Sequence, residues 1–193
     1  MSIRGKVARD VTDTDDSAER KLLDDMLAML PRLRRFAYGL TGSASEGDDL
    51  VQITFEKAMR ARSQWQPGSR LDSWLFRIAQ NAFRNELRSR GRHAAYLQAV
   101  EPHQVSAVDG RTIVDDRARF ASLRAALGRL PDEQRVALLL VAIGNHSYAE
   151  TAGILELPIG TVMSRISRAR RALRGMLDER PEPNSPQDAE ARP

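Results

Sequence analysis

Apolar residues in this chain recur at helical spacing in two blocks, and the stretch between the blocks has no sustained period. The first block begins at Leu22 and the second at Ala118, while residues 91–117 contain two glycines and a proline. Apolar residues at i, i+3, i+4 and i+7 predict amphipathic helices, and no segment alternates for long enough to predict a strand. We therefore expect an all-α fold: two small helical domains joined by a flexible linker, the C-terminal one a helix-turn-helix.

The composition shifts along the chain, and these shifts set the expected domain boundaries. Residues 1–20 have little apolar content, and the fourteen residues at the C-terminus contain four prolines. Such segments bury too little apolar surface to fold alone. The predicted organisation is a disordered N-terminal segment at 1–20, a helical domain at 21–92, a linker at 93–117, a helical domain at 118–178 and a disordered tail at 179–193.

The first block is expected to form three helices, separated by the loops TGSASEGDD and SQWQPGSR. The first covers about residues 22–40, with a kink or a restart at Pro31. The second covers about 48–62 and the third about 71–90. On the third helix, Trp74 and Phe83 fall on the apolar face, and Phe76 is grouped with the arginines and asparagines as a candidate contact residue. Interleaved aromatic and basic residues suit unstacked bases, although a solvated helix face is the plainer interpretation.

The second block has the layout of a helix-turn-helix domain. Helices are expected at about 118–130 and from Pro131 to about residue 143. Ser147-Tyr-Ala-Glu150 is a capping-box sequence for a short third helix, and Pro158 opens a last helix that reaches about Asp178. Five arginines and no acidic residue lie between Pro158 and Leu177. A short capped helix, a tight turn and a basic helix are typical of a domain whose second helix enters the major groove.

Charge is distributed unevenly and points to polyanionic partners. Residues 31–93 hold twelve basic and six acidic residues, and residues 118–180 hold ten and six, although the net charge of the whole chain is only +4. Two separated basic blocks suggest contact with a polyanion at two places.

Composition also excludes several classes of protein. The chain has no cysteine, no apolar run of the roughly 18 to 20 residues that span a membrane, and no N-terminal signal-peptide pattern. Its three histidines are scattered, and Asp48 and Asp49 have no third ligand at metal-binding spacing. No nucleophile–base or phosphate-binding motif is present. We expect a cytoplasmic protein that is not an enzyme, inserts in no membrane and needs no metal and no cofactor.

Three motif blocks in this order resemble the extracytoplasmic-function (ECF) sigma factors of bacterial RNA polymerase, the small sigma-70 type with regions 2 and 4 only. GDDLVQITFEKAMR resembles the segment that binds core polymerase. WQPGSRLDSWLFRIAQNAFRNELRSRGR resembles the segment that melts and reads the −10 element. LPDEQRVALLLVAIGNHSYAETAGILELPIGTVMSRISRARRAL resembles the domain that reads the −35 element. The resemblance covers about residues 22–92 and 118–177.

The resemblance implies partners and site residues. The partners are core RNA polymerase (the beta-prime clamp helices and the beta flap), promoter DNA and an anti-sigma factor, in a stress or envelope response. Matching residues for core polymerase are Asp48, Asp49, Leu50 and Gln52. Those for the −10 element are Ser63, Gln64, Trp65, Gln66, Arg70, Arg77, Asn81, Arg84, Asn85 and Arg88. Those for the −35 element are Thr161, Met163, Ser164, Arg165, Ser167, Arg168 and Arg171.

Four residues depart from the family pattern. Asn85 stands where aspartate is common, Thr151 where isoleucine is usual, and Met163 where a polar or basic residue is frequent. Glu156 replaces the usual turn glycine, which costs about 1 kcal/mol if the turn needs a positive φ. Two other classes stay open: a sigma-like decoy that sequesters an anti-sigma factor, and an ordinary helix-turn-helix regulator. The retained arginines argue against a decoy. The first helical block, which is separate from the helix-turn-helix, argues against an ordinary regulator.

Overall fold

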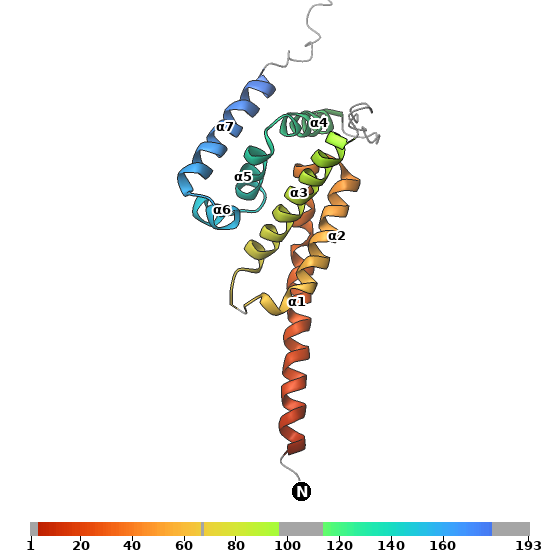
Figure 1. Cartoon of the computed structure of the whole chain (residues 1–193). Coiled ribbons are helices and arrows are strands. Elements are labelled where there is room, and N and C mark those ends of the chain that lie inside the picture. The colour runs from red at the N-terminus through yellow and green to blue at the C-terminus, as the bar shows by residue number, and fades with distance from the viewer. Residues whose placement is uncertain (1–3, 67, 97–113, 179–193) are drawn as a thin grey trace, which may run out of the picture.

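The computed structural model describes residues 4–66, 68–96 and 114–178, and these residues form helices, turns and no strand. The first block contains α1 (Arg4–Thr41), α2 (Ala44–Arg60), the short 3-10 helix η1 (Arg62–Gln64) and α3 (Leu71–Tyr96). The second contains α4 (Val114–Gly128), α5 (Asp132–Ala142), α6 (Tyr148–Leu155) and α7 (Ile159–Asp178) (Figure 1). The predicted all-α class and its helix-turn-helix are confirmed. The linker core at 97–113 and the tail at 179–193 lie outside the described residues.

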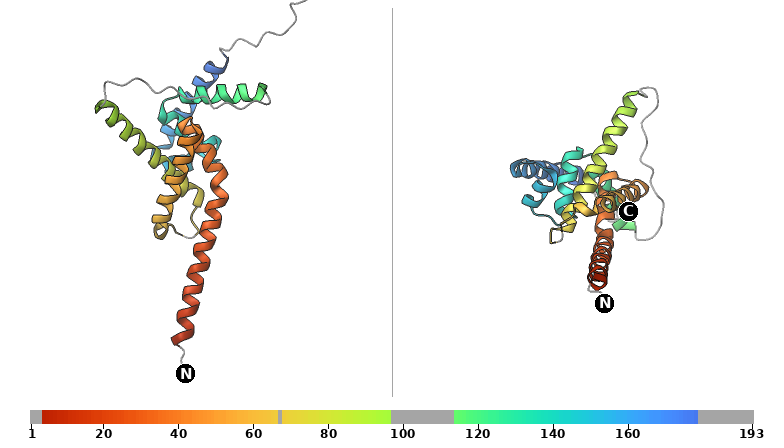
Figure 2. Two further views of the ribbon diagram at one scale, coloured as in Figure 1. Left: turned by 90° about the vertical axis from the view of Figure 1, so that its right-hand side faces the viewer. Right: turned by 60° about the horizontal axis from the view of Figure 1, so that its bottom comes forward.

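The helix α1 is longer than the sequence predicts. It begins at Arg4, within the segment expected to be disordered, and it runs through Pro31 without a break. Once a helix is nucleated by packing, each further residue adds a hydrogen bond at little cost, so α1 can extend beyond its packed half. Its N-terminal half projects away from the other helices in all three ribbon views (Figures 1 and 2).

The helices α2 and α3 pack against α1. Phe36 and Phe76 meet edge to face with ring centroids 4.9 Å apart, and both are fully buried. Phe76 is therefore a core residue, and its expected role as a contact residue is wrong. A second, smaller cluster closes the other end of this bundle, with Leu22, Met26, Ala58 and Leu75 at its centre. Trp74 packs against that cluster, as its position on the apolar face predicts.

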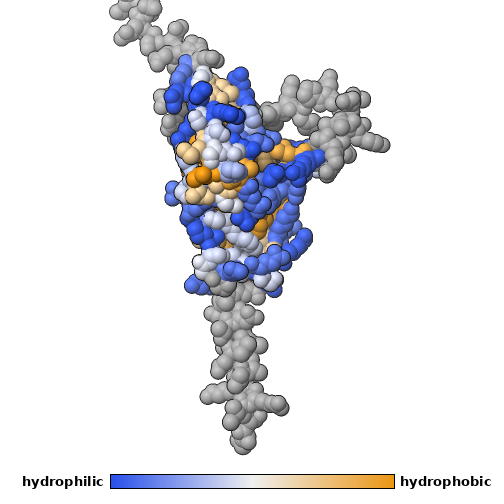
Figure 3. All heavy atoms as spheres, turned by 60° about the vertical axis from the view of Figure 1, so that its left-hand side comes forward, coloured by the Kyte–Doolittle hydropathy of each residue, from blue (hydrophilic) through white to orange (hydrophobic). Residues whose placement is uncertain are grey.

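The helix-turn-helix is built by local signals that the sequence carries. Ser147 caps α6 in the predicted capping box, with its hydroxyl accepting from the Glu150 amide and the Glu150 carboxylate accepting from the Ser147 amide. Glu156 ends α6 in the left-handed conformation, at φ 56°. Of the two alternatives for this turn, the one with a positive φ at Glu156 is therefore present. On α7, Val162 is fully buried and holds the helix to its domain. Figure 3 shows this side of the molecule as mostly hydrophilic, with a band of apolar surface across it.

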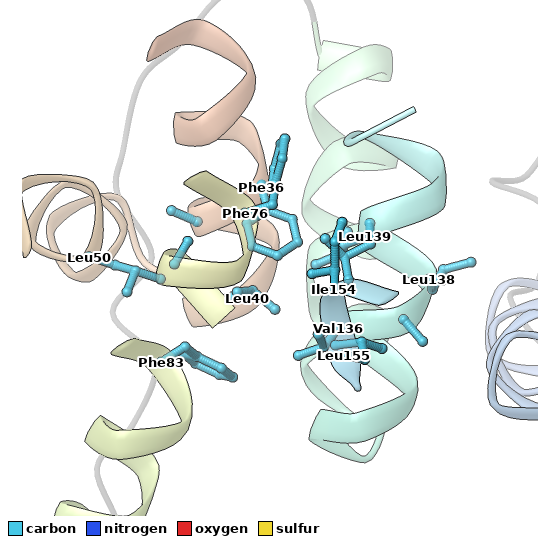
Figure 4. Packing of buried hydrophobic residues seen from close by; sticks show 14 of the residues in the cluster. Phe36, Leu40, Leu50, Phe76, Phe83, Val136, Leu138, Leu139, Ile154 and Leu155 are labelled. Atoms are coloured by element: carbon cyan, nitrogen blue, oxygen red, sulfur yellow. The ribbon is translucent and has the colours of Figure 1, made fainter. Parts of the chain in front are cut away.

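The two helical domains share one hydrophobic core. Helix α1 contacts α4 and α5, and α3 contacts α6. Figure 4 shows Phe36 and Phe76 from the first domain facing Leu139 and Ile154 from the second. Gly39 lies at the crossing of α1 and α5, where an added Cβ would lie 2.8 Å from a Leu139 methyl. The sequence predicts two domains, and the structure adds that they are docked directly onto each other.

Candidate nucleic-acid interface

The exposed side of α7 presents a basic surface. Ile166 and Ala169 are buried and Met163, Ser167, Arg168 and Arg171 are exposed, which follows from the helical spacing of the apolar residues. A hollow of about 410 Å³ lies along this side. Its lining residues are Tyr148, Met163, Ile166, Ser167, Arg170, Arg171 and Arg174. Arg170 was absent from the predicted set, although it shares a helix face with Met163 and Ser167 and donates to the Tyr148 hydroxyl at 3.3 Å.

A second side of α7, which carries Arg165, faces the first domain. Arg165 pairs with Glu133 of α5 and lines a hollow of about 120 Å³ together with Arg84 and Gln80 of α3. Thr161 and Ser164 are half-buried, and the Ser164 hydroxyl donates to the Thr161 carbonyl at 2.9 Å. The predicted −35 set is thus divided between an open side and a partly covered side of one helix.

The middle of α3 carries a polar stripe. Its members are exposed and lie at i, i+3, i+4 and i+7, so they fall on one helix face: Asn81, Arg84, Asn85 and Arg88. Burial of Ala79, Ala82 and Phe83 on the opposite side fixes the direction in which this stripe points. The structure brings together the four α3 residues that the sequence analysis grouped.

The loop before α3 has a mixed character. Ser63, Gln64 and Gln66 are exposed, and Pro67 lies outside the described residues. The Trp65 ring is half-buried against the small cluster, and its indole nitrogen is buried without a hydrogen-bond partner among the described residues. The ring therefore anchors the loop, while the polar side chains on either side of it face solvent.

Arg70 and Arg77, which precede the stripe, contact the second domain. Arg70 bonds Asp72 at 2.7 Å and also pairs with Glu150 of α6. Arg77 donates to the Gly153 carbonyl at 2.7 Å and lies 4.0 Å from the Glu156 carboxylate. Each guanidinium therefore bonds the other domain directly. Sequence spacing gives no sign of these pairs, because the partners are 76 to 80 residues apart.

The same boundary holds a partly buried carboxylate, Asp72, and a buried imidazole, His146. Burial tends to raise the pKa of Asp72, but hydrogen bonds from Arg70 and the Ser73 amide outweigh it and hold that pKa below its usual value. Burial lowers the pKa of His146, which is 2% exposed, and the charge of Asp72 only partly opposes this. Neither ring nitrogen of His146 has a hydrogen-bond partner among the described residues. Its ring meets Phe76 edge to face at 5.2 Å.

The predicted polymerase-binding residues lie on α2 beside a hollow of about 490 Å³ between α2 and α3. Asp49 and Gln52 are exposed. Asp48 accepts from Arg34 at 3.0 Å and from the Tyr38 hydroxyl at 3.2 Å. Leu50 is 5% exposed and belongs to the hydrophobic core. Its expected role as a contact with core polymerase is therefore corrected: it packs on the buried side of α2. Ile53, which was not predicted, is exposed on the same rim.

Two kinds of site are not found within the part of the chain that the structure describes. No group of three or more His, Asp or Glu side chains could hold a metal ion there. No helix among these residues is long and apolar enough to cross a membrane.

A basic helix-turn-helix joined to a second helical domain with its own polar and basic stripe defines a two-region DNA-binding protein. The family model for Sigma-70 region 2 matches residues 26–93, and that for Sigma-70 region 4 matches residues 120–173. Among curated proteins, the ECF RNA polymerase sigma factor EcfG of Rhodopseudomonas palustris is 40% identical over 156 residues, which cover 81% of this chain and 84% of EcfG. The RNA polymerase sigma factor HrpL of Pseudomonas syringae is 32% identical over 180 residues, covering 89% and 96%.

Solved structures agree with these matches. The sigma factor RpoE of Bartonella quintana, solved with the anti-sigma factor NepR, has a TM-score of 0.73 at 32% identity and covers 84% of this chain and 99% of its own. CnrH, solved with the cytosolic domain of CnrY, has a TM-score of 0.60 at 30% identity and covers 83% and 89%. The chain belongs to the ECF RNA polymerase sigma factors. It is a regulatory DNA-binding protein of promoter-specific transcription initiation.

Proposed function

We propose that the protein binds promoter DNA through two surfaces on different helices while α2 holds core RNA polymerase. The open side of α7 reads the −35 element in the major groove. The stripe on α3 and the loop before it follow the unstacked −10 strand. The observation that carries this proposal is the exposed stripe of α3, since its four side chains point away from a core that fixes their direction.

The −35 reading follows from the chemistry of the exposed α7 side chains. Arg168 and Arg171 are one helical turn apart and suit two phosphates of one groove. Ser167 can bond a base edge, and Met163, which is 51% exposed, suits the methyl group of a thymine. Arg165 reaches DNA only after it leaves Glu133.

The −10 reading depends on contact with bases outside a duplex. Asparagine amides at positions 81 and 85 can pair with the edges of exposed bases, and Arg84 and Arg88 can neutralise the phosphates between them. Unstacking costs a few kcal/mol per base, so capture of bases by this surface and by Ser63, Gln64 and Gln66 offsets part of that cost. Trp65 supports this loop from the core side.

The rim of α2 is the proposed contact with the beta-prime clamp helices. Asp49 and Gln52 offer polar groups there and Ile53 offers an apolar one, while Asp48 is held in place by Arg34 and Tyr38. Because RpoE of Bartonella quintana was solved with an anti-sigma factor, we also assign an anti-sigma partner to this chain. The protein then acts in the cytoplasm, where polymerase is, with the beta flap as a further contact of the second domain.

Transcription in vitro tests the proposal. Core polymerase with this protein is incubated with a library of genomic fragments, and the 5′ ends of the RNAs are sequenced. We expect starts downstream of a shared pair of elements. The double variant Arg84→Ala/Asn85→Ala should lose these starts, whereas Lys21→Ala, an exposed residue of α1, should retain them. Absence of starts together with absence of binding to core would refute the proposal, and tight duplex binding without polymerase would favour an ordinary helix-turn-helix regulator.

A further inference from the structure

One acidic residue near the start of α2 is bonded to α1. The Asp48 carboxylate accepts from the Arg34 guanidinium at 3.0 Å and from the Tyr38 hydroxyl at 3.2 Å, and both bonds end on the same oxygen, Oδ1. Arg34 and Tyr38 are four residues apart on α1, so they reach α2 from one helix face. The carboxylate is thus held by two donors of the neighbouring helix.

The ring of Tyr38 lies against the backbone of α2 at a glycine. Gly47 is buried, and a Cβ added there would overlap the Tyr38 ring at Cδ1 and Cε1. Any larger residue at this position has to displace the ring. Glycine at this position therefore lets α1 and α2 approach closely enough for the tyrosine hydroxyl to reach the next residue, Asp48.

Asp48 and Asp49 point in different directions although they are neighbours in sequence. Successive residues of a helix lie about 100° apart around its axis. Asp49, Gln52 and Ile53 line the hollow of about 490 Å³ between α2 and α3 and form the proposed polymerase-binding rim, whereas the Asp48 carboxylate is bonded to α1. The first aspartate faces a neighbouring helix, and the second faces the hollow.

The first turns of α2 are bonded to a neighbouring helix on both sides of this rim. On the α1 side the acceptor is Asp48, and on the α3 side Glu46 pairs with Arg90 at 3.0 Å. The charged side chains of these pairs are about half exposed, so the pairs add little to the stability of the fold. They restrict the directions that the α2 side chains can take, and a preformed binding surface loses less conformational freedom when its partner arrives.

We propose that Asp48 is a positioning residue of the polymerase-binding rim and not itself a contact with polymerase. Its carboxylate, held by Tyr38 and Arg34, fixes the first turns of α2 so that the rim faces the partner. This inference rests on the proposed function, because it takes the rim as the contact with the clamp helices. It changes the role that the resemblance implies for Asp48, and it adds two residues of α1 to those on which polymerase affinity depends.

The test is the affinity of the full chain for core polymerase in the absence of DNA. A fluorescent label at Lys21→Cys, an exposed position of α1 in a chain that has no cysteine, reports binding by anisotropy. Asp48→Ala removes the acceptor, and Asp48→Asn keeps an oxygen in its place. The double variant Tyr38→Phe/Arg34→Gln removes both donors and leaves Asp48 unchanged. Urea unfolding of each variant gives the folded fraction, for which the affinity is corrected.

A positioning role predicts that Asp48→Ala weakens binding about fivefold, as expected when the binding-competent arrangement becomes a minor fraction. Asp48→Asn should retain most of the affinity, because the amide oxygen still accepts from both donors. Tyr38→Phe/Arg34→Gln should weaken binding by a similar factor, and Asp48→Ala should have no further effect in that background.

A direct contact of Asp48 with polymerase predicts a different pattern. The alanine and asparagine variants would then be equally weak, and the double variant that lacks the donors would bind like the parent chain. Asp48→Ala would have its full effect in both backgrounds. This pattern would overturn the inference.

Gly47→Ala tests the same arrangement without a change of charge. The added methyl group displaces the Tyr38 ring and should weaken binding. Gly175→Ala, in the interior of α7, is the matched control, because a Cβ there meets nothing within 4 Å. Equal affinity of these two variants would count against the positioning role.

Asp49→Ala/Gln52→Ala separates the inference from the proposed function. If this double variant weakens binding while the Asp48 variants behave as a direct contact, only the positioning role fails. If it leaves the affinity unchanged, the proposed contact of the rim fails, and the positioning role fails with it.

Discussion

The helices α3 and α7 both carry arginines on a polar side, but they present them differently. On α7, Arg168 and Arg171 are exposed because the buried residues of that helix face its own domain. On α3, Arg77 bonds the Gly153 carbonyl and lies beside Glu156 of the other domain, although its side chain is still 46% exposed, and the stripe from Asn81 onward is exposed. Arginine therefore forms an open surface on α7, whereas on α3 one exposed arginine also bonds the other domain. The difference lies in domain docking, which no local pattern encodes.

The largest predicted effect comes from breaking the core that both domains share. Phe76→Ala removes a fully buried ring that packs against Phe36 and His146. We expect a loss of about 3–5 kcal/mol in the free energy of unfolding, since the change deletes apolar packing and leaves a cavity. Urea unfolding followed by circular dichroism measures it. Phe120→Ala, at a residue that is 71% exposed, should cost less than about 0.5 kcal/mol.

The same experiment separates a shared core from two independent domains. With a shared core, probes in both domains should report one transition that moves to lower urea in Phe76→Ala. If a probe in the second domain reported an unchanged transition, the docking would not contribute to stability.

The next effect distinguishes the two DNA surfaces. Arg168→Ala/Arg171→Ala should weaken binding of the polymerase complex to duplex promoter DNA and reduce the salt dependence of log K by about 2, because two phosphates are no longer neutralised. Arg84→Ala/Arg88→Ala should leave that initial binding nearly unchanged and reduce strand opening, measured by permanganate reactivity of unpaired thymines. Equal effects of the two double variants on both steps would contradict the assignment of separate surfaces.

The turn between α6 and α7 should show a smaller effect. Glu156 is held at φ 56°, a conformation that costs a non-glycine residue about 1 kcal/mol or more. Its contact with Arg77 is exposed and worth little. Glu156→Gly should therefore raise the melting temperature slightly. A melting temperature that stays the same or falls would show that the carboxylate contact with Arg77 outweighs the backbone strain.

The smallest effect is expected on the acid side of neutrality. His146 faces Asp72 and Arg70 at the N-terminal end of α3 and Arg32 of α1, and burial lowers its pKa. Between the ordinary pKa of about 6.5 and the lower folded value, the unfolded chain binds more protons, so stability falls as the pH decreases through this window. Asp72, whose pKa is also lowered, loses its contribution only at still lower pH.

Substitution of the imidazole isolates this pH dependence. The free energy of unfolding at pH 7.5 and at pH 5.5 is compared between the parent chain and His146→Leu. The decrease from the higher to the lower pH should be larger in the parent. Equal decreases in both proteins would show that His146 does not contribute to acid sensitivity.

Local signals in the sequence were sufficient to predict much of the helix-turn-helix and of α3. The capping box at Ser147 follows from residue type and spacing, and the shared face of the four stripe residues follows from helical spacing once the resemblance has selected them. These features depend on residues within a few positions of one another, and helix geometry fixes their relation.

The remaining features depend on contacts between distant parts of the chain. Phe76 sits between arginines and asparagines in sequence, and only the docked α5 and α6 reveal that its side is covered. Leu50 is interior on the apolar side of α2, and it entered the polymerase-binding set through the resemblance alone. The ion pairs of Arg70 and Arg77 join residues in different domains. Periodicity gives the apolar side of a helix but does not tell which other helix will cover it.

The sharpest test of the docked arrangement places labels at Lys57→Cys on α2 and Gly175→Cys on α7, two exposed positions in a chain that has no cysteine, and follows them from the free protein into the initiation complex. Energy transfer between the labels is measured first in the free chain and then with core polymerase and promoter DNA. We expect high transfer in the free chain and a large decrease in the complex, because the −10 and −35 surfaces must separate to reach their elements. Equal transfer in the two states would contradict the separation of the two domains on promoter DNA.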